Sequence, residues 1–502
     1  MTGFFSRLLS RQSSSATVAQ RPNASSSSSS STSSSSVTAS SSLSMSESGS
    51  HSVDDHLVEG LSLNDCAPER APAGLAMKAT PMNNYLSPAL SDFHVLVSIT
   101  SPEKTSGSKR LPTELCIVLD ISGSMSGERI AFAKRAICDV LAQLTPEDRV
   151  HFVTYNTSAS VVFKNERAGS SKVKALQNQV RTVRANGGTN IGAGLEMAAS
   201  LFKPSDRALN RRVFLFSDGQ NNAGHMRSTT EFARFISRLH ASAQVSTSAF
   251  GIGTGFNEEL MGAIAEAGEG HYFFIQSEAA IPDVVFRAFE FLTLSMGSGA
   301  QLEVHALGGA EVQRIYGTCS RTTAPIGTLT YGNTRTVLVQ LSAPHFPPAA
   351  AGEGEEVATP VLTAVLTYRS LAGGRVTLSA DASLVLTHDD AKGLDSAHQN
   401  ADVAMEVATQ LAADQEEAAL QLLRKGEVEA ARQITSNSTA QYRTAYTACS
   451  GRLSEKARAR ASKQAADMEQ YDYSSGGSAC YAKQVGYRAK QKRKGSFGFS
   501  MF

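Results

Sequence analysis

Cysteine is scarce in this chain of 502 residues, and none of its six cysteines forms a Cys-x-x-Cys pair. A zinc ribbon or a RING-type site within the chain is therefore not expected. Apolar runs are also short, since none approaches the roughly 20 residues that a helix needs to span a bilayer. We expect no transmembrane segment, and a protein that is soluble or at most peripherally attached. An excess of charge of either sign is lacking as well, because 47 basic and 46 acidic residues nearly cancel. We therefore expect no nucleic-acid partner.

The N-terminal region, residues 1–80, differs in composition from the rest. It contains a serine tract at 25–36, which cannot bury enough apolar surface to offset the entropy of ordering, so we expect disorder. The first residues combine arginines with an apolar helical face and have no acid before Glu47, as organelle transit peptides do. A disordered tail on a cytoplasmic protein is the favoured interpretation, and an organelle or nuclear location is the alternative.

Residues 112–298 alternate buried strands with amphipathic helices. Leu115–Leu119 is a continuous apolar run that ends at Asp120, and residues 128–144 repeat apolar positions at helical spacing. Further apolar runs lie at 150–155, 213–216, 245–252 and 271–275, with helical segments between them. This alternation predicts an α/β fold with a doubly wound, mostly parallel sheet that helices cover on both faces.

The periodicity changes after residue 298. Residues 299–390 hold strand-like segments separated by Gly, Pro and Ser clusters, which predicts an antiparallel β-sandwich or small barrel. A strand within 81–111 has no place in the α/β unit, so we expect it to pair with this later β-domain. Residues 396–472 predict a helical domain, interrupted at Gly426 and again at Ser436–Ser438. The Lys and Arg residues of segment 473–502 predict a basic, flexible tail. A nuclear signal and an anionic-lipid patch are the alternatives.

Three polar loops carry a candidate site. Asp120, Ser122 and Ser124 follow the first core strand, Thr189 precedes a helix, and Asp218 ends another buried strand. Such loops converge at the carboxyl edge of an open α/β sheet. Mg²⁺ prefers oxygen ligands and keeps waters, so the three hydroxyls can bind it directly while the two carboxylates hold coordinated waters. One position would stay open for a carboxylate from outside. Helix capping by Asp and Ser is the simpler alternative.

The sequence around these loops resembles von Willebrand factor A domains with an intact metal-ion-dependent adhesion site. The matching segments are Ile117–Met125, Asn186–Ile191, Leu215–Gly219 and Phe250–Gly253. The resemblance implies that a divalent ion, Mg²⁺ with Mn²⁺ or Ca²⁺ as alternatives, binds at Asp120, Ser122, Ser124, Thr189 and Asp218. The arrangement of the α/β unit, the β-domain and the helical region, including the tail segment 467–488, is similar to that in plant root-waving-type ubiquitin ligases and in A-domain proteins linked to Hint modules. Those ligases carry an N-terminal RING finger, which this chain lacks, so ligase activity is not expected.

A non-enzymatic adaptor or scaffold is the expected function, with the metal binding an Asp or Glu side chain of a partner protein. No residue is assigned a catalytic role, and none is assigned to a cofactor other than the metal. A Mg²⁺-assisted hydrolase is the alternative, with His225 as a general base, although no activated nucleophile is evident. A secreted structural protein similar to inter-alpha-trypsin inhibitor heavy chains is a third hypothesis. The oligomeric state and the partner do not follow from the sequence.

Overall fold

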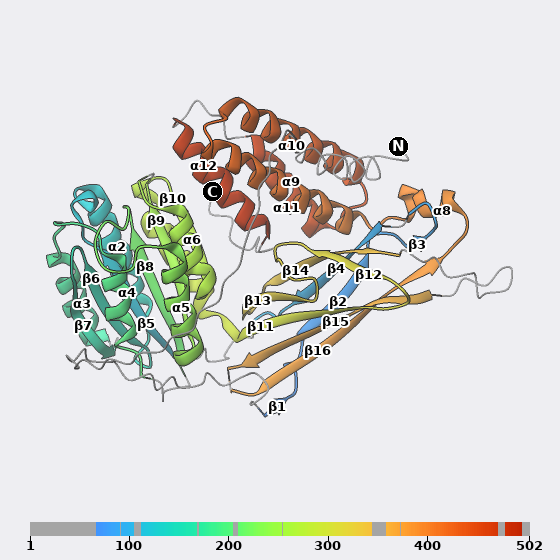
Figure 1. Cartoon of the computed structure of the whole chain (residues 1–502). Helices are drawn as coiled ribbons and strands as arrows, with labels where there is room; N and C mark the ends of the chain where they lie inside the picture. Colours follow the sequence, from blue (N-terminus) through green and yellow to red (C-terminus); the bar gives the residue numbers. More distant parts are fainter. Residues whose placement is uncertain are drawn as a thin grey trace, which may run out of the picture. The chain divides into compact units, whose positions relative to one another are not determined.

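The computed structural model describes residues 67–90, 92–104, 112–167, 170–203, 209–253, 255–343, 358–371, 373–469 and 477–493. The predicted disorder of the serine tract lies outside these residues. The described residues form an α/β domain, a β-domain of two sheets and a group of C-terminal helices (Figure 1). Within them, no helix has the length and apolar character needed to cross a membrane.

The α/β domain is built on a six-stranded sheet in the order β10-β9-β8-β5-β6-β7. Its neighbouring strands are parallel except β6 and β7, which are antiparallel at one edge. The predicted parallel strands are confirmed, whereas β7 was not predicted. The strand bounds are β5 Thr113–Asp120, β6 Arg149–Tyr155, β7 Ala159–Arg167, β8 Asn210–Ser217, β9 Val245–Ile252 and β10 Glu269–Ile275.

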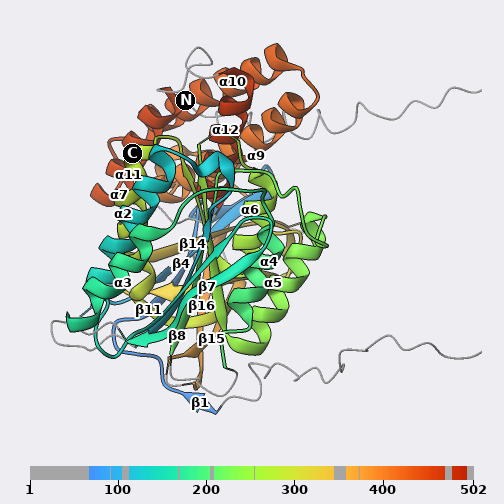
Figure 2. The ribbon, with the colours of Figure 1, turned by 90° about the vertical axis from the view of Figure 1, so that its left-hand side faces the viewer.

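Helices cover both faces of this sheet because each central strand is apolar on both sides (Figure 2). In β5, Leu115 and Ile117 pack in the core beneath α2, α3 and α7, while Cys116 and Val118 pack in the core beneath α4, α5 and α6. The helix bounds are α2 Glu128–Gln143, α3 Ser170–Thr182, α4 Ile191–Ala199, α5 Thr229–Ala243, α6 Glu258–Ala267 and α7 Ile281–Thr293. The predicted doubly wound α/β fold is thus confirmed.

The β-domain contains strands from both sides of the α/β domain in the sequence. Strand β4 pairs antiparallel with β14 along its whole length, with Val97 opposite Val337, so the α/β domain is inserted between β4 and β11. One sheet has the order β12-β14-β4-β2, and the other has the order β1-β16-β15-β11-β13 with β3 also paired to β16. The two sheets share one apolar core. The bounds are β1 Pro68–Glu69, β2 Ala76–Pro81, β3 Tyr85–Leu86, β4 Asp92–Thr100, β11 Ser295–Ala306, β12 Glu311–Ile315, β13 Thr323–Thr330, β14 Thr334–Ser342, β15 Ala358–Ser370 and β16 Arg375–Leu386.

The expectation of disorder up to residue 80 is wrong for the residues that the structure describes. Strand β2 pairs with β4, which supplies the backbone partners that a lone segment lacks. Leu75 and Ala79 are buried in the core of the β-domain. Only a few apolar residues anchor this segment, and composition averaged over the serine-rich region conceals them.

The C-terminal helices follow a short helix, α8 (Asp390–Leu394). They are α9 Ala401–Arg424, α10 Val428–Cys449, α11 Glu455–Glu469 and α12 Gly477–Arg493. Gly426, in the left-handed region at φ 82°, separates α9 from α10. The predicted break at Ser436–Ser438 is wrong, because α10 continues through it. Ser438 is buried there, so packing against the neighbouring helices overrides the weak helix preference of serine.

The predicted flexible tail is also wrong for residues 477–493, which form α12. Its Tyr481 and Val485 are buried, and Tyr487 joins the core beneath α4, α5 and α6. Lys483 donates to the Phe256 carbonyl oxygen at 2.6 Å and lies 4.0 Å from the centre of that ring. Lys492 is buried with its ammonium 2.7 Å from Glu416. Basic residues therefore serve here as packing elements, because their stems are apolar and their ammonium groups contact polar or aromatic groups within the protein.

Acid should weaken the β-domain through His94. This side chain is fully buried in β4, and burial lowers its pKa from 6.5 to about 4. The unfolded chain therefore binds the extra proton first, and the free energy of unfolding should fall as the pH drops from 6.5 to about 4, by at most about 3 kcal/mol. Urea unfolding at several pH values measures this slope, which should become shallower in His94→Phe. An unchanged slope in the variant would exclude His94 as its source.

Candidate metal centre

The first loop of the site begins where β5 ends. Asp120 is fully buried, and its Oδ1 accepts a hydrogen bond from the Ser122 backbone N–H at 2.8 Å. This bond turns the chain back over the end of the strand, and a single 3-10 turn, η2 (Gly123–Met125), leads into α2. Ser122 and Ser124 thereby face the same side, with their hydroxyl oxygens 3.0 Å apart.

The other two loops meet this one. Ser124 donates to Asp218 Oδ1 at 2.8 Å, which joins the ends of β5 and β8. The Gly123 N–H donates to the Gly187 carbonyl oxygen at 3.0 Å and brings in the loop before α4. A β-carbon at Gly219 would lie 3.4 Å from Thr189 Oγ1 and 3.7 Å from Ser124 Oγ, so these two hydroxyls flank the same small space. The structure therefore gathers all five residues singled out in the sequence.

Thr189 is held by side chains of the β8–α5 loop. Its N–H donates to Asn222 Oδ1 at 2.9 Å, and the N–H of Ile191 donates to Asn221 Oδ1 at 3.0 Å. Asn190 then caps α4 by accepting from the Ala193 N–H. These bonds satisfy backbone donors at the start of α4 and fix the loop that carries Thr189.

Helix capping does not explain the serines. Ser122 precedes η2 without making a side-chain cap, and α2 begins after Gly127, which has no capping side chain. The hydroxyls of Ser122 and Ser124 instead face each other and Asp218. Of the five side chains only Ser124 is exposed, so the cluster is reached from the surface at that residue.

Two further residues contact the carboxylates and were given no role from the sequence. Ser217 is buried and donates to Asp120 Oδ2 at 3.0 Å. Arg129 donates from Nη1 to Asp218 Oδ2 at 2.7 Å, while its Nε donates to Glu278 at 3.2 Å. Because Ser217 is adjacent to Asp218 at the end of β8, its position near the site can be inferred from the sequence. Arg129 lies in the first turn of a helix, and nothing in its surroundings marks it.

The electrostatics of the cluster follow from burial. Burial raises the pKa of Asp120 to about 6, and the charge of Asp218 adds to this, while hydrogen bonds from Ser122 and Ser217 oppose it. The hydrogen bond to Asp218 raises the pKa of Arg129 further above its already high value. The site thus holds two adjacent buried carboxylates that repel each other, and one guanidinium offsets part of their charge. A second cation among these oxygens would relieve the repulsion.

His225, the candidate general base, lies outside the cluster. Its side chain is 74% exposed, and Nε2 is 3.1 Å from Glu196 Oε1. No contact in the described residues joins it to Asp120 or Asp218. The histidine faces solvent beside a surface carboxylate, which is the ordinary environment of a loop histidine.

Comparison with known proteins identifies the family of the α/β domain. Residues 114–287 match the family described as von Willebrand factor type A domain. An uncharacterized protein of Synechocystis is 26% identical over 201 residues, which is 40% of this chain and 45% of that protein. The match therefore spans less than half the length of this relative.

Two solved structures resemble most of the chain. A von Willebrand factor type A protein from Catenulispora acidiphila has a TM-score of 0.57 at 19% identity, covering 77% of this chain and 88% of its own. The ArnB paralog VWA2 from Sulfolobus acidocaldarius has a TM-score of 0.55 at 15% identity, covering 85% and 100%. At these identities the likeness establishes the fold alone. Together with the family match, it shows that this chain carries a von Willebrand factor type A domain.

Proposed function

We propose that this protein is an adaptor or scaffold that binds a divalent cation, Mg²⁺ first, and through it an acidic side chain of a partner protein. The observation that carries the proposal is the meeting of three loops, which places two carboxylates beside three hydroxyls at the carboxyl edge of one sheet. Von Willebrand factor type A domains commonly bind a divalent metal and mediate protein interactions, which supports both halves of the proposal.

The donor set fits a hard cation. Every side chain in the cluster offers oxygen, and neither a thiol nor an imidazole belongs to it, which favours Mg²⁺, Mn²⁺ or Ca²⁺ over softer ions. Ser122, Ser124 and Thr189 would hold the ion by their hydroxyls, with Asp120 and Asp218 as its charged partners. When bound, the ion would supply an electrophilic position that accepts a carboxylate.

The partner would approach over Ser124, the exposed member of the cluster. Two carboxylates balance a divalent charge, so a further carboxylate from outside would meet little net repulsion. The same site ringed by four acids would retain metal and repel that ligand. The domain arrangement of this chain resembles that of plant ubiquitin ligases, but its cysteines do not have RING-type zinc-ligand spacing. We therefore propose that the protein binds its partner without transferring ubiquitin. The cytoplasmic location stays a prediction.

The test joins direct metal binding to partner capture. Mn²⁺ is titrated into the full chain, with bound ion followed by electron paramagnetic resonance, and tagged protein captures partners from lysate with Mg²⁺ or with EDTA. Asp120→Ala should abolish ion binding and every Mg²⁺-dependent capture while leaving the fold intact by circular dichroism. Asp381→Ala, an exposed acid of β16, is the matched control and should behave as wild type.

The two halves of the proposal can fail separately. Full ion binding in Asp120→Ala would contradict the metal site. Ion binding that is lost in Asp120→Ala, together with partner capture that EDTA leaves unchanged, would retain the metal site and exclude the adaptor function. Turnover of a phosphoester that is lost in Asp218→Asn would replace the adaptor by a hydrolase.

A further inference from the structure

Arg129, in the first turn of α2, places a positive charge directly on a carboxylate of the metal centre. Its Nη1 donates to Asp218 Oδ2 at 2.7 Å and to the Ser124 carbonyl oxygen at 3.3 Å. The other oxygen of this carboxylate, Oδ1, accepts from the Ser124 hydroxyl at 2.8 Å. Both oxygens of Asp218 therefore have hydrogen-bond donors within the protein.

Two further segments hold this guanidinium in place. Its Nε donates at 3.2 Å to Glu278, which opens the 3-10 turn η3 (Glu278–Ala280) before α7. On another side lies Gly253, just after β9, where a β-carbon would be 3.3 Å from Arg129 Nη2. The end of β9, the start of α7 and the first turn of α2 thus surround the group. Arg129 is positioned at the metal centre and is not a freely moving surface side chain.

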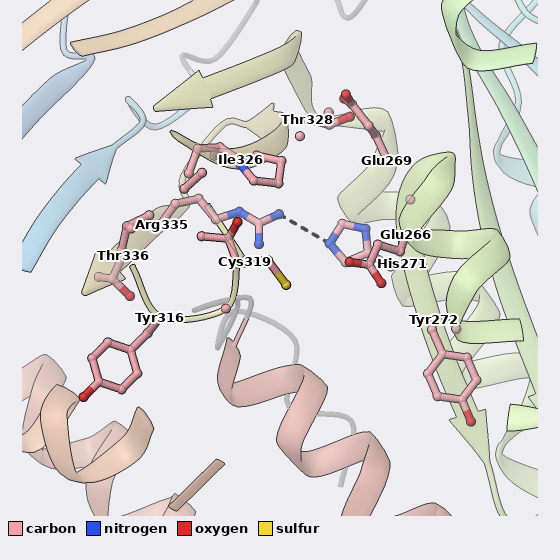
Figure 3. A pocket seen from close by; sticks show the side chains of 18 of the residues that line it. Glu266, Glu269, His271, Tyr272, Tyr316, Cys319, Ile326, Thr328, Arg335 and Thr336 are labelled. Carbon is pink, nitrogen blue, oxygen red and sulfur yellow. Dashed lines mark hydrogen bonds between the residues drawn. The ribbon is translucent and has the colours of Figure 1, made fainter. Parts of the chain in front are cut away.

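The exposure of Arg129 allows its contact with Asp218 to break. The Arg129 side chain is 32% exposed, whereas that of Asp218 is fully buried. Arg335 is the contrasting case: it is 7% exposed in a cavity lined by residues of β10, β13 and β14, where Figure 3 shows its guanidinium pointing to His271, 3.4 Å away. An enclosed guanidinium cannot exchange its partner for water, but a partly exposed one can. Arg129 can therefore release Asp218 without becoming a buried charge that lacks solvation.

A divalent ion at this centre and Arg129 need the same carboxylate. Asp218 is one of the two charged partners of the ion in the proposed site, and it is also the acid that Arg129 contacts with Nη1. Two cations close to one carboxylate repel each other, and the burial of Asp218 keeps water from screening that repulsion. Glu278 offsets part of the arginine charge, but it contacts Nε, away from Asp218. An ion can therefore bind only against the charge of Arg129.

We propose that Arg129 competes with the divalent ion for Asp218 and thereby sets the affinity of the metal centre. The inference rests on the proposed function, since it requires a divalent ion at the three loops. Arg129 stabilises the pair of buried carboxylates by its own charge, and the ion must replace that contribution in order to bind. Removal of the arginine charge should therefore tighten ion binding, although it removes a contact from the protein.

The experiment titrates Mn²⁺ into the full chain and follows bound ion by electron paramagnetic resonance. Arg129→Gln should bind Mn²⁺ about tenfold more tightly than wild type, or better, because the competing charge is gone. Arg135→Gln removes the same charge from an exposed position further along α2, and it should bind within about twofold of wild type because solvent screens that charge. A damaged fold cannot produce a gain in affinity. Equal or weaker binding by Arg129→Gln would overturn the proposal.

Arg129→Lys tests whether charge is the cause. It keeps the positive charge and loses the fork, so its Kd for Mn²⁺ should stay within about threefold of wild type. An affinity as high as that of Arg129→Gln would show that the charge does not compete, and the proposal would fail. If neither wild type nor Arg129→Gln binds Mn²⁺, the metal centre itself is wrong. The failure of the inference is thus distinguishable from that of the proposed function.

Thermal unfolding provides a second measure. With EDTA, Arg129→Gln should unfold at a lower temperature than wild type, because Asp120 and Asp218 then repel each other without a compensating charge. Added Mn²⁺ should narrow this gap, since the ion binds the folded variant more tightly and stabilises it more. A gap that Mn²⁺ leaves unchanged would contradict competition between the ion and Arg129.

Discussion

Replacing Glu114 by Gln should lower the free energy of unfolding by about 3–5 kcal/mol. Glu114 lies in β5, and its two oxygens contact His151 of β6 at 3.3 Å and Arg211 of β8 at 3.0 Å. All three side chains are at most 5% exposed. The amide keeps the shape of the carboxylate and removes its charge, so the Arg211 guanidinium stays buried without its compensating charge. That cost is large because water cannot reach the group.

Glu166→Gln provides the matched control for this change. Glu166 pairs with Lys172 at 3.3 Å in the same domain, but the two side chains are 34% and 63% exposed. Loss of an exposed pair costs no more than about 1 kcal/mol. Urea unfolding of the two variants and the wild type, followed by circular dichroism, compares them directly. Equal destabilisation by both changes would show that the Glu114 network contributes no more than a surface pair.

Gly270→Ala should destabilise the α/β domain by about 3 kcal/mol or more. A β-carbon at Gly270 would lie 2.0 Å from the Thr247 carbonyl oxygen and 2.4 Å from the carbonyl carbon of the same residue. Both are backbone atoms of β9, the strand that pairs with β10, so no side-chain rotation relieves the clash. The strands would have to separate where their register already shifts, between Glu269 and Tyr272.

Gly451→Ala is the comparison for this second change. Gly451 has no atom within 4 Å of its β-carbon position and does not adopt a positive φ. Alanine there should be neutral or slightly stabilising, because it restricts the unfolded chain. The midpoint of thermal unfolding should fall for Gly270→Ala and stay for Gly451→Ala. A wild-type midpoint in Gly270→Ala would mean that β9 and β10 tolerate a wider spacing.

Local pattern predicts the α/β domain well because its signals are local. The short apolar run Leu115–Leu119, followed by an amphipathic helical segment, favours a strand buried on both faces, which places the polar residues after it at the sheet edge. The five proposed metal ligands were therefore found from three short segments. Arg129 was not, because its contact with Asp218 depends on how α2 packs against the end of β8, and sequence spacing does not encode that.

Prediction is poorer where a segment depends on a distant partner. Strand β2 is short and follows a polar region, and it is stabilised by β4 and not by its own composition. Helix α12 contains so many Lys and Arg residues that its pattern favours a solvated tail. Glu416, on α9, provides the charge that makes a buried Lys492 possible. Tertiary pairing of this kind overrides local preference.

The pairing of β4 with β14 also orders events during synthesis. When β4 leaves the ribosome, its partner strand β14 has not yet been made. The whole α/β domain must be translated before β14 appears. Folding of the inserted domain fixes its two ends and so removes most of the chain entropy that would oppose closing so long a loop. The inserted domain should therefore fold first, as nascent domains generally do. Until β14 has been made and has paired, the edge of β4 that will face it is open to pairing with other chains.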